Sequence, residues 1–183
     1  MSSTTQQLYE QTLVLRSQLG DERAFEELLR MHGPRLFLFA SKMMQGSSDV
    51  VEDLLQEIWL AIYKGLPGLR DVTKFRPWAV RIARDRIYRE YRRRKPAERS
   101  LDHEAAEELV AEDDADSAVE VEELNRGLHT ISPEHREVLV LCYFDQMSYA
   151  EIAEATGASL GTVRSRIHYA KRALRDALKG SMS

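Results

Sequence analysis

The stretch SYAEIAEATGASLGTVRSRIHYAKRALRDAL, residues 148–178, predicts two helices joined by a tight turn. Ser148 and Glu151 have the S-x-x-E spacing of a capping box, which marks the start of the first helix. Gly157 tolerates a positive φ angle and ends that helix. Ser159 then caps a second, longer helix, whose apolar residues recur every three or four positions and form one buried stripe. The stripe consists of Leu160, Val163, Ile167, Ala170, Leu174 and Leu178.

The opposite face of the second helix is polar and cationic. It carries Arg164, Ser165, His168, Lys171, Arg172 and Arg175. A short capped helix, a glycine turn and a basic second helix are typical of a helix-turn-helix, whose second helix enters the DNA major groove. We expect Arg164 to read a base, with Ser165 and His168 beside it, because recognition helices read bases with their N-terminal residues. Lys171 and Arg172 are expected to contact phosphate. A plain corner between two helices with a solvated basic face is the alternative.

Charge is distributed unevenly along the 183 residues, although the formal net charge is only −4. Residues 1–95 hold 17 Lys and Arg against 12 Asp and Glu, and residues 124–183 hold 8 against 6. Between them, residues 96–123 hold 1 basic side chain against 12 acidic ones. Two mildly basic blocks flanking an acidic strip indicate separate modules, so the negative total does not exclude a nucleic-acid partner.

The first block predicts several helices. Residues 1–20 are polar and are expected to fray. A helix is expected from Asp21, and His32-Gly33-Pro34 is expected to interrupt it before a further helix that ends near Met44. The next helix, at residues 50–66, is expected to bury Val51, Leu54, Leu55, Ile58 and Ile62. Its exposed face carries Asp53, Gln56 and Glu57.

The last helix of this block is rich in arginine and aromatic residues. Pro77 suits its first turn, and Val80, Ala83, Ile87 and Tyr91 form its apolar stripe. Arginines at residues 81–95 alternate with aromatic rings, a pattern that suits single-stranded DNA, because bases stack on rings and cations follow the backbone. The alternative is that Phe75 and Trp78 belong to the core and the arginines are merely solvated.

Residues 96–118 have the composition of a flexible acidic linker. Helicity is expected to resume near Val119, and Ser132-Pro133 is expected to begin a largely buried helix. No segment shows the alternation of a strand. We therefore expect an all-α fold with two small helical domains, at residues 21–95 and 119–183, joined by this linker. Residues 1–20 would form a polar N-terminal segment.

The sequence offers no arrangement of catalytic residues. It has no Walker loop and no GxGxxG motif, and its five histidines are scattered. We therefore expect neither an enzyme nor a cofactor or metal site. The single Cys142 fits a reducing compartment, and the N-terminus is too polar for a signal peptide. No apolar run approaches the ~20 residues that span a bilayer, so a cytoplasmic protein is expected.

Three segments in this order resemble bacterial RNA polymerase sigma factors of the extracytoplasmic-function (ECF) group. They are VEDLLQEIWLAIYKGL at residues 51–66, FRPWAVRIARDRIYREYRRR at residues 75–94 and LNRGLHTISPEHREVLVLCYFDQMSYAEIAEATGASLGTVRSRIHYAKRAL at residues 124–174. They resemble, respectively, the helix that binds the polymerase clamp, the segment that melts the −10 promoter element and the domain that binds the −35 element. Asp85 stands where the family often has Asn.

The resemblance implies a sigma factor that binds core RNA polymerase through the β′ clamp and the β flap and initiates transcription of a specific regulon. It implies a clamp contact through Asp53, Gln56 and Glu57. It implies −10 contacts through Lys74, Phe75, Trp78, Arg81, Arg84 and Tyr88. It implies −35 contacts through Arg164, Ser165, His168, Lys171 and Arg172. Promoter DNA and an anti-sigma factor are the other implied partners.

Two alternatives remain open at this stage. In the family the linker threads the polymerase channel, where an acidic strip would mimic nucleic acid, but a simple solvated linker fits the composition as well. A one-component repressor with an N-terminal sensor domain would use the helix-turn-helix alone and dimerise on a palindrome. Such a repressor has no use for the helices at residues 51–66 and 75–94.

Overall fold

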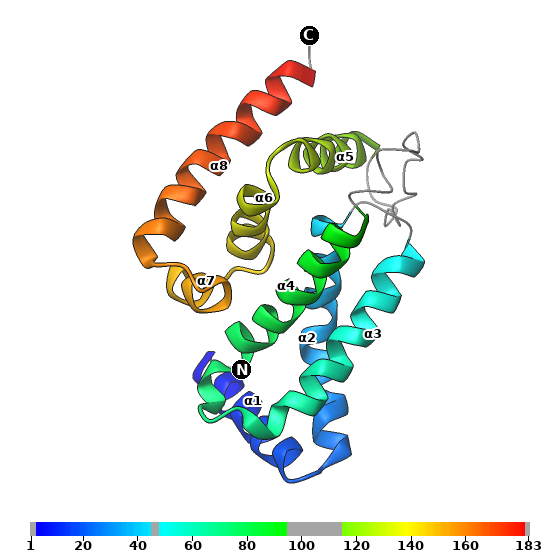
Figure 1. Cartoon of the computed structure of the whole chain (residues 1–183), viewed down its shortest axis with the longest axis vertical. Coiled ribbons are helices and arrows are strands. Elements are labelled where there is room, and N and C mark those ends of the chain that lie inside the picture. The colour runs from blue at the N-terminus through cyan, green and yellow to red at the C-terminus, as the bar shows by residue number, and fades with distance from the viewer. Residues whose placement is uncertain (1–2, 45–47, 95–114, 182–183) are drawn as a thin grey trace.

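The computed structural model describes residues 3–44, 48–94 and 115–181, and within these ranges the chain consists of helices and short connections, with no strand (Figure 1). The predicted all-helical fold class is confirmed. The N-terminal half contains α1 (Ser3–Gln18), α2 (Glu22–Met43), α3 (Ser48–Gly65), two 3-10 turns (Leu66–Gly68 and Val72–Lys74) and α4 (Phe75–Arg94). The C-terminal half contains α5 (Ala115–Thr130), α6 (Pro133–Leu139), a π-helical turn (Val140–Phe144), α7 (Tyr149–Thr156) and α8 (Leu160–Ser181).

The polar N-terminal segment forms the helix α1, and the prediction that it frays is wrong. Leu13 and Val14 are 2% and 0% exposed, and they anchor α1, which packs on α2. Gln18 Nε2 donates hydrogen bonds to the carbonyls of Leu66 at 3.0 Å and Leu69 at 2.7 Å. Ordering a short helix costs conformational entropy, and the helix propensity of α1 alone is too small to offset that cost. The contacts of Leu13, Val14 and Gln18 supply the rest of the stabilisation.

The prediction that His32-Gly33-Pro34 interrupts a helix is also wrong, because α2 continues through these residues. Proline lacks an N–H and leaves the carbonyl of Arg30 without its helical partner. Both Pro34 and Arg30 lie on the exposed side of α2, where solvent can hydrate that carbonyl. The buried stripe runs along α2 on both sides of the proline and outweighs the lost hydrogen bond. It consists of Ala24, Leu28, His32, Leu36, Phe39, Ala40 and Met43.

The helices α3 and α4 form where they are predicted, with differences at their ends and faces. Trp59 joins the buried side of α3, whereas Leu55 is only half-buried. The helix α4 begins at Phe75, two residues before the expected start. Asp71 caps the 3-10 turn just before it, since its carboxylate accepts a hydrogen bond from Thr73 N at 3.0 Å. The backbone is therefore already helical at the residue where α4 begins.

The caps of the helix-turn-helix have the geometry that the sequence predicts, whereas Leu160, expected in the buried stripe of α8, is 54% exposed. Ser148 Oγ accepts a hydrogen bond from Glu151 N at 3.2 Å, and the Glu151 carboxylate accepts one from Ser148 N at 2.8 Å, so the capping box is complete. Gly157 has φ +70° and ends α7. Ser159 Oγ accepts from Thr162 N at 3.1 Å at the start of α8.

The start of α5 corrects the boundary expected near Val119, because the helix begins at Ala115. Most of the predicted acidic linker, residues 96–114, lies outside the described residues, so its flexibility stays a prediction. Ser132 caps α6 as expected, with its hydroxyl accepting from His135 N at 3.3 Å. The π-helical turn that follows α6 has no signal in the sequence.

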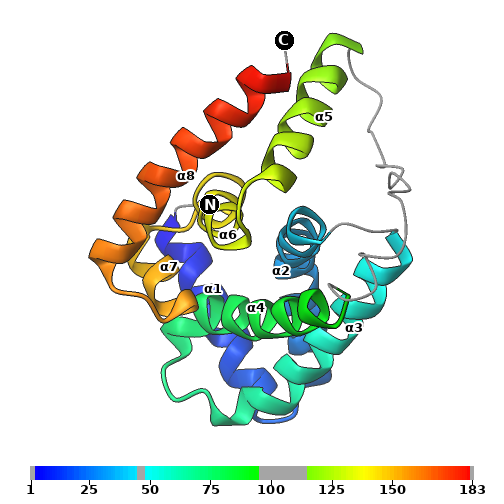
Figure 2. The same ribbon diagram turned by 45° about the horizontal axis from the view of Figure 1, so that its top comes forward.

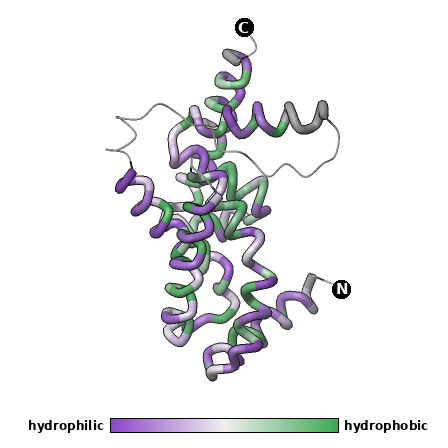
Figure 3. The backbone as a smooth tube through the Cα atoms, turned by 90° about the vertical axis from the view of Figure 1, so that its right-hand side faces the viewer, coloured by the Kyte–Doolittle hydropathy of each residue, from purple (hydrophilic) through white to green (hydrophobic). Residues whose placement is uncertain are grey.

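The two halves of the molecule pack against each other. The helix α4 lies against α7, and α2 contacts α5, α6 and the π-helical turn; Figure 2 shows α4 lying across the base of the C-terminal half. Arg136 in α6 is 3% exposed and joins the halves. Its guanidinium donates to the carbonyls of Leu128 at 2.8 Å, His129 at 3.0 Å and, in α2, Met43 at 2.9 Å. Figure 3 shows a stretch of hydrophobic residues, coloured green, in the middle part of the molecule.

Candidate nucleic-acid interface

The predicted clamp contact lies on one exposed face of α3. Asp53, Gln56 and Glu57 are all exposed, as the helical spacing predicts. Leu60 and Tyr63, which are 53% and 49% exposed, continue the same face by helical spacing. An acidic surface with exposed apolar side chains suits a protein partner more than a nucleic acid. Sequence reasoning missed Leu60 and Tyr63, although their spacing from Glu57 was the available signal.

The predicted −10 residues do not form one exposed surface. Phe75 is 0% exposed and packs edge-on to His32, with ring centroids 5.1 Å apart. The prediction that it contacts DNA is therefore wrong, and Phe75 is a core residue that fixes the start of α4. Trp78 is half-buried, and its ring lies 3.1 Å from the position a Cβ would take on Gly65. Arg81 is exposed.

Arg84 and Tyr88 both meet a carboxylate of the C-terminal half. Arg84 Nε donates to Glu137 Oε1 at 2.7 Å, and the Tyr88 hydroxyl donates to Glu137 Oε2 at 3.3 Å. The Arg84 guanidinium also lies over the Tyr88 ring, 4.7 Å from its centroid. Glu137 is 0% exposed, and burial raises the pKa of its carboxyl despite the neighbouring Arg84. Burial, and then the charge of Glu137, raise the pKa of Tyr88, so its hydroxyl stays protonated.

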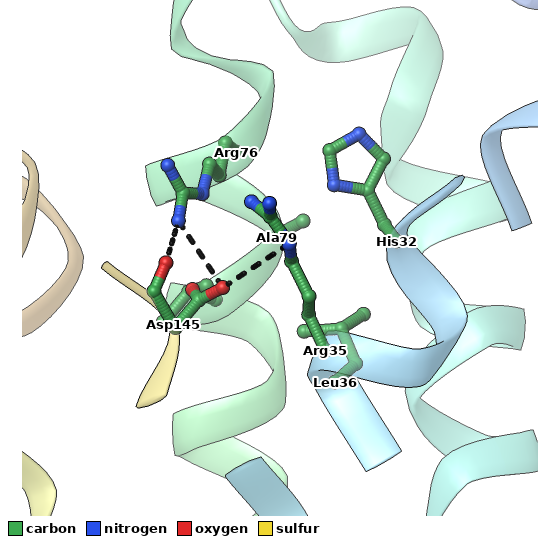
Figure 4. A pocket seen from close by; sticks show the side chains of 7 residues that line it. His32, Arg35, Leu36, Arg76, Ala79 and Asp145 are labelled. Carbon is green, nitrogen blue, oxygen red and sulfur yellow. Dashed lines mark hydrogen bonds and ion pairs between the residues drawn. The ribbon is translucent and has the colours of Figure 1, made fainter. Parts of the chain in front are cut away.

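A second group of ion pairs lies at the other end of α4. Arg76 pairs with Asp145 at 3.1 Å and with Glu151 at 3.5 Å, and Arg35 reaches Asp145 at 3.8 Å. Figure 4 shows Arg35 and Arg76 converging on Asp145 beside a small pocket. Asp145 is 6% exposed, and burial raises the pKa of its carboxyl, an effect that Arg76 opposes. Lys74, predicted to contact DNA, forms an ion pair with Glu154 of α7.

Sequence reasoning missed this entire set of contacts between the halves. Glu137 stands in an apolar run and Asp145 in a loop, and neither position has a local pattern that marks it. The one available signal was a charged residue, Glu137, within a helix predicted to be largely buried. A buried carboxylate requires a partner, but the sequence does not say which arginine supplies it.

The predicted −35 residues are brought together on α8. Arg164, Ser165, His168, Lys171 and Arg172 are all exposed, and α8 lies along the outer edge of the molecule in Figures 1 and 2. Lys171 Nζ lies 4.9 Å from the centroid of the exposed Tyr143 ring, and a hydrogen bond to Tyr143 raises the pKa of Lys171. The face therefore combines freely exposed cations with one cation held against an aromatic ring.

Neither a metal-binding group nor a membrane-spanning helix is found among the described residues. No group of three His, Cys, Asp or Glu among them could hold a metal ion. None of their helices is long and apolar enough to cross a membrane.

A helical half with an exposed acidic face on α3 and a basic α4, packed on a helix-turn-helix half, is the architecture expected of a sigma-70-type factor. Family models agree: "Sigma-70 region 2" matches residues 28–97 and "Sigma-70, region 4" matches residues 122–174. The chain belongs to the ECF RNA polymerase sigma factors. It is therefore a transcription initiation factor and not an enzyme.

Individual relatives give the extent of the similarity. ECF RNA polymerase sigma factor SigE of Mycolicibacterium smegmatis is 32% identical over 167 residues, which cover 87% of this chain and 64% of that protein. RNA polymerase sigma factor CarQ of Myxococcus xanthus is 32% identical over 163 residues, covering 87% of this chain and 91% of CarQ. The solved structure of CnrH in complex with the cytosolic domain of CnrY has a TM-score of 0.73 and 25% identity, covering 94% of this chain and 98% of CnrH.

Proposed function

We propose that this sigma factor recognises the −35 element through the outer face of α8 and the −10 element through α4. The observation that carries the proposal is the exposed row on α8, in which Arg164, Ser165 and His168 occupy the first turns. Arg is the commonest side chain for bidentate contact with guanine, and a good pair contributes ~1–3 kcal/mol of discrimination between bases. Lys171 and Arg172, further along the helix, are expected to contact phosphate.

Binding-site selection with the polymerase holoenzyme tests this assignment. Arg164→Ala should relax the preference at one −35 position, whereas the matched control Arg172→Ala should weaken all sequences alike and flatten the dependence on salt. If Arg164→Ala lowers affinity uniformly and leaves the −35 preference unchanged, the reading face is assigned wrongly.

We further propose that Lys74, Trp78, Arg81, Arg84 and Tyr88 contact the −10 element when the promoter melts, Lys74, Arg84 and Tyr88 after exchanging their present carboxylate partners for DNA. The rings and cations of this set suit a single strand, since bases stack on rings and arginines follow the phosphates. Phe75 supports the surface from the core. Arg81→Ala is the cleanest test, because Arg81 is exposed and belongs to no ion pair described above. Closed promoter complexes should survive this change, and opening, read by permanganate reactivity, should fall.

The exposed face of α3 is proposed to bind the polymerase clamp. Replacing Asp53, Gln56 and Glu57 together by Ala should weaken binding to core RNA polymerase and leave the helix content unchanged, because all three side chains are exposed. Unchanged affinity for the core enzyme in this triple variant would remove α3 from the interface. The β flap is proposed to contact the helix-turn-helix half.

An anti-sigma factor is the remaining proposed partner. The structural relative CnrH is in complex with the cytosolic domain of CnrY, and the fold of CnrH matches most of this chain. Co-purification from cells, with and without the inducing condition, would identify the partner directly.

A further inference from the structure

A tyrosine from outside α8 lies against the outer face of that helix. Tyr143 belongs to the π-helical turn and is 50% exposed, whereas Val140 and Leu141 of the same turn are 0% exposed. The Nζ of Lys171 lies 4.9 Å from the centroid of the Tyr143 ring. A hydrogen bond to the Tyr143 side chain raises the pKa of Lys171, so the ammonium keeps its charge at neutral pH. A lysine of the proposed −35 surface is thus held by a side chain from another element.

The π-helical turn explains why this ring faces outward. Asp145 N donates to the carbonyl of Val140 at 3.0 Å, a hydrogen bond that spans five residues instead of four. In a regular α-helix Tyr143 would follow Arg136 and Leu139 on one side, and both of these residues are only 3% exposed. The wider turn takes Tyr143 off that buried side and toward α8. Single π-helical turns of this kind are frequent at functional sites.

The place of Lys171 on α8 indicates what the pair contacts. Lys171 follows Arg164 by seven residues, so the two side chains share one face of the helix, about 10 Å apart along its axis. Base edges are read by the N-terminal residues of a recognition helix, whereas the first helix of the motif crosses the DNA backbone. Tyr143 lies in the segment that leads into this first helix, α7. Both positions therefore favour a phosphate over a base.

We propose that Tyr143 and Lys171 together bind one phosphate of the −35 duplex, with Tyr143 positioning the Lys171 ammonium and donating a second hydrogen bond. The inference rests on the proposed −35 surface and extends it by one residue. An ammonium has three N–H donors, and the bond to Tyr143 uses one, so two remain for phosphate oxygens. Because the Tyr143 oxygen accepts from the ammonium, its own O–H can donate to the same phosphate.

The surroundings of the pair favour an anion. Burial raises the pKa of the Cys142 thiol, which also bonds to the Tyr143 side chain, so the sulfur stays uncharged. A neutral thiol is a weak acceptor and gives way to a phosphate oxygen. In the described part of the chain no carboxylate forms an ion pair with Lys171, and the groups that raise its pKa are tyrosines and Cys142. The ammonium is therefore held in place without being neutralised.

Holding the lysine in place increases its contribution to binding. A lysine that is fixed by a ligand loses rotamer freedom, and this loss opposes binding. The Tyr143 ring already confines Lys171 before DNA arrives, so less freedom is lost on association. Tyr143 should therefore affect affinity even though it carries no charge.

Methylphosphonate substitution of single phosphates tests the shared contact. The probe is a duplex obtained by the binding-site selection described above, with one −35 phosphate at a time made neutral, and the protein is the holoenzyme. At one position the wild type should lose affinity about tenfold. Lys171→Ala and Tyr143→Ala should bind the unmodified duplex more weakly and should both be insensitive to the methylphosphonate at that same position. Tyr143→Phe, which keeps the ring, should lose about threefold on the unmodified duplex.

The salt dependence separates the two roles. Lys171→Ala should reduce the slope of log affinity against log salt concentration by about 0.9, because one cation no longer displaces a counterion. Tyr143→Phe should lower affinity and leave this slope unchanged. Arg172→Ala is the control on α8 and should stay sensitive at the shared phosphate. Tyr9→Phe removes the hydroxyl of another tyrosine, 44% exposed on α1, and should leave affinity unchanged.

The outcomes distinguish this inference from the −35 assignment on which it rests. If both Tyr143 variants bind as the wild type does and stay sensitive at the Lys171 phosphate, the positioning role is refuted. If Arg172→Ala becomes insensitive at a −35 phosphate but Lys171→Ala and Tyr143→Ala do not, the −35 surface stands and the shared contact is refuted. If no α8 variant changes affinity, the −35 surface itself is wrong and the inference falls with it. Weaker binding of Tyr143→Ala to core polymerase alone would show that the pair holds a protein segment, which also refutes the phosphate contact.

Discussion

Replacing Arg136 by Met is the most direct test of how the two halves are joined. The side chain is 3% exposed and donates three hydrogen bonds to carbonyls, two within its own half and one to Met43 of α2. Methionine keeps most of the volume and removes every donor. Hydrogen bonds that involve a charged group contribute ~1.5–3 kcal/mol each, and removing the charge relieves its burial cost, which is seen in the lowered pKa of the guanidinium.

The net loss expected from Arg136→Met is ~3 kcal/mol in the free energy of unfolding. For a chain of this length, that loss lowers Tm by about 6–12 °C. Unfolding in urea is followed by circular dichroism, which reports all helices, and by tryptophan fluorescence, which reports the N-terminal half because both tryptophans, Trp59 and Trp78, lie there. The exposed Arg126→Met is the control and should change stability by less than ~0.5 kcal/mol. A loss below ~1 kcal/mol for Arg136→Met would refute the reasoning.

Two further predictions concern packing and pH. Gly127→Ala puts a Cβ 2.9 Å from Leu178 Cδ2 and 3.1 Å from Leu174 Cδ1, so both leucine side chains must move, and calorimetry should show a loss of ~1–3 kcal/mol in the free energy of unfolding. A loss near zero would show that both side chains rotate away without strain. Burial raises the pKa of Glu137 above its ordinary value of 4.5 in the folded protein, so the folded form binds a proton at this carboxyl more readily than the unfolded chain. The contribution of Glu137 to the free energy of unfolding should therefore increase as pH falls through its raised pKa and decrease as pH rises, which urea unfolding of the wild type and of Glu137→Gln across this range would measure. A contribution of Glu137 that shrinks as pH falls would contradict this sign.

Local signals predicted much of this fold. The capping box of Ser148 and Glu151, the positive φ of Gly157 and the Ser132 cap depend on residues within one helical turn of each other, so the sequence displays them directly. The exposed faces of α3 and α8 follow from helical spacing alone. These features need no knowledge of what packs against them.

Features that depend on residues far apart in the chain could not be predicted from the sequence. Pro34 reads as a helix breaker until the buried stripe on both sides of it is seen to pack. Phe75 reads as a DNA-stacking ring until His32 is found against it. Arg84 and Glu137 are 53 residues apart, and their pairing depends on how the halves dock. Each miss is a case in which tertiary packing overrides a local pattern.

The shared use of Arg84 has an evolutionary consequence. If one guanidinium serves both a promoter strand and Glu137, a substitution at either position alters two selected properties at once. Homologues in which Arg84 is replaced by a shorter or uncharged residue should therefore have an apolar residue at the position of Glu137. A buried carboxylate without a cationic partner would lower the stability of the fold. Exposed partners such as Lys74 and Glu154 carry no such penalty and should drift independently. An alignment of close homologues should thus show correlated change at the buried pair and none at the exposed one.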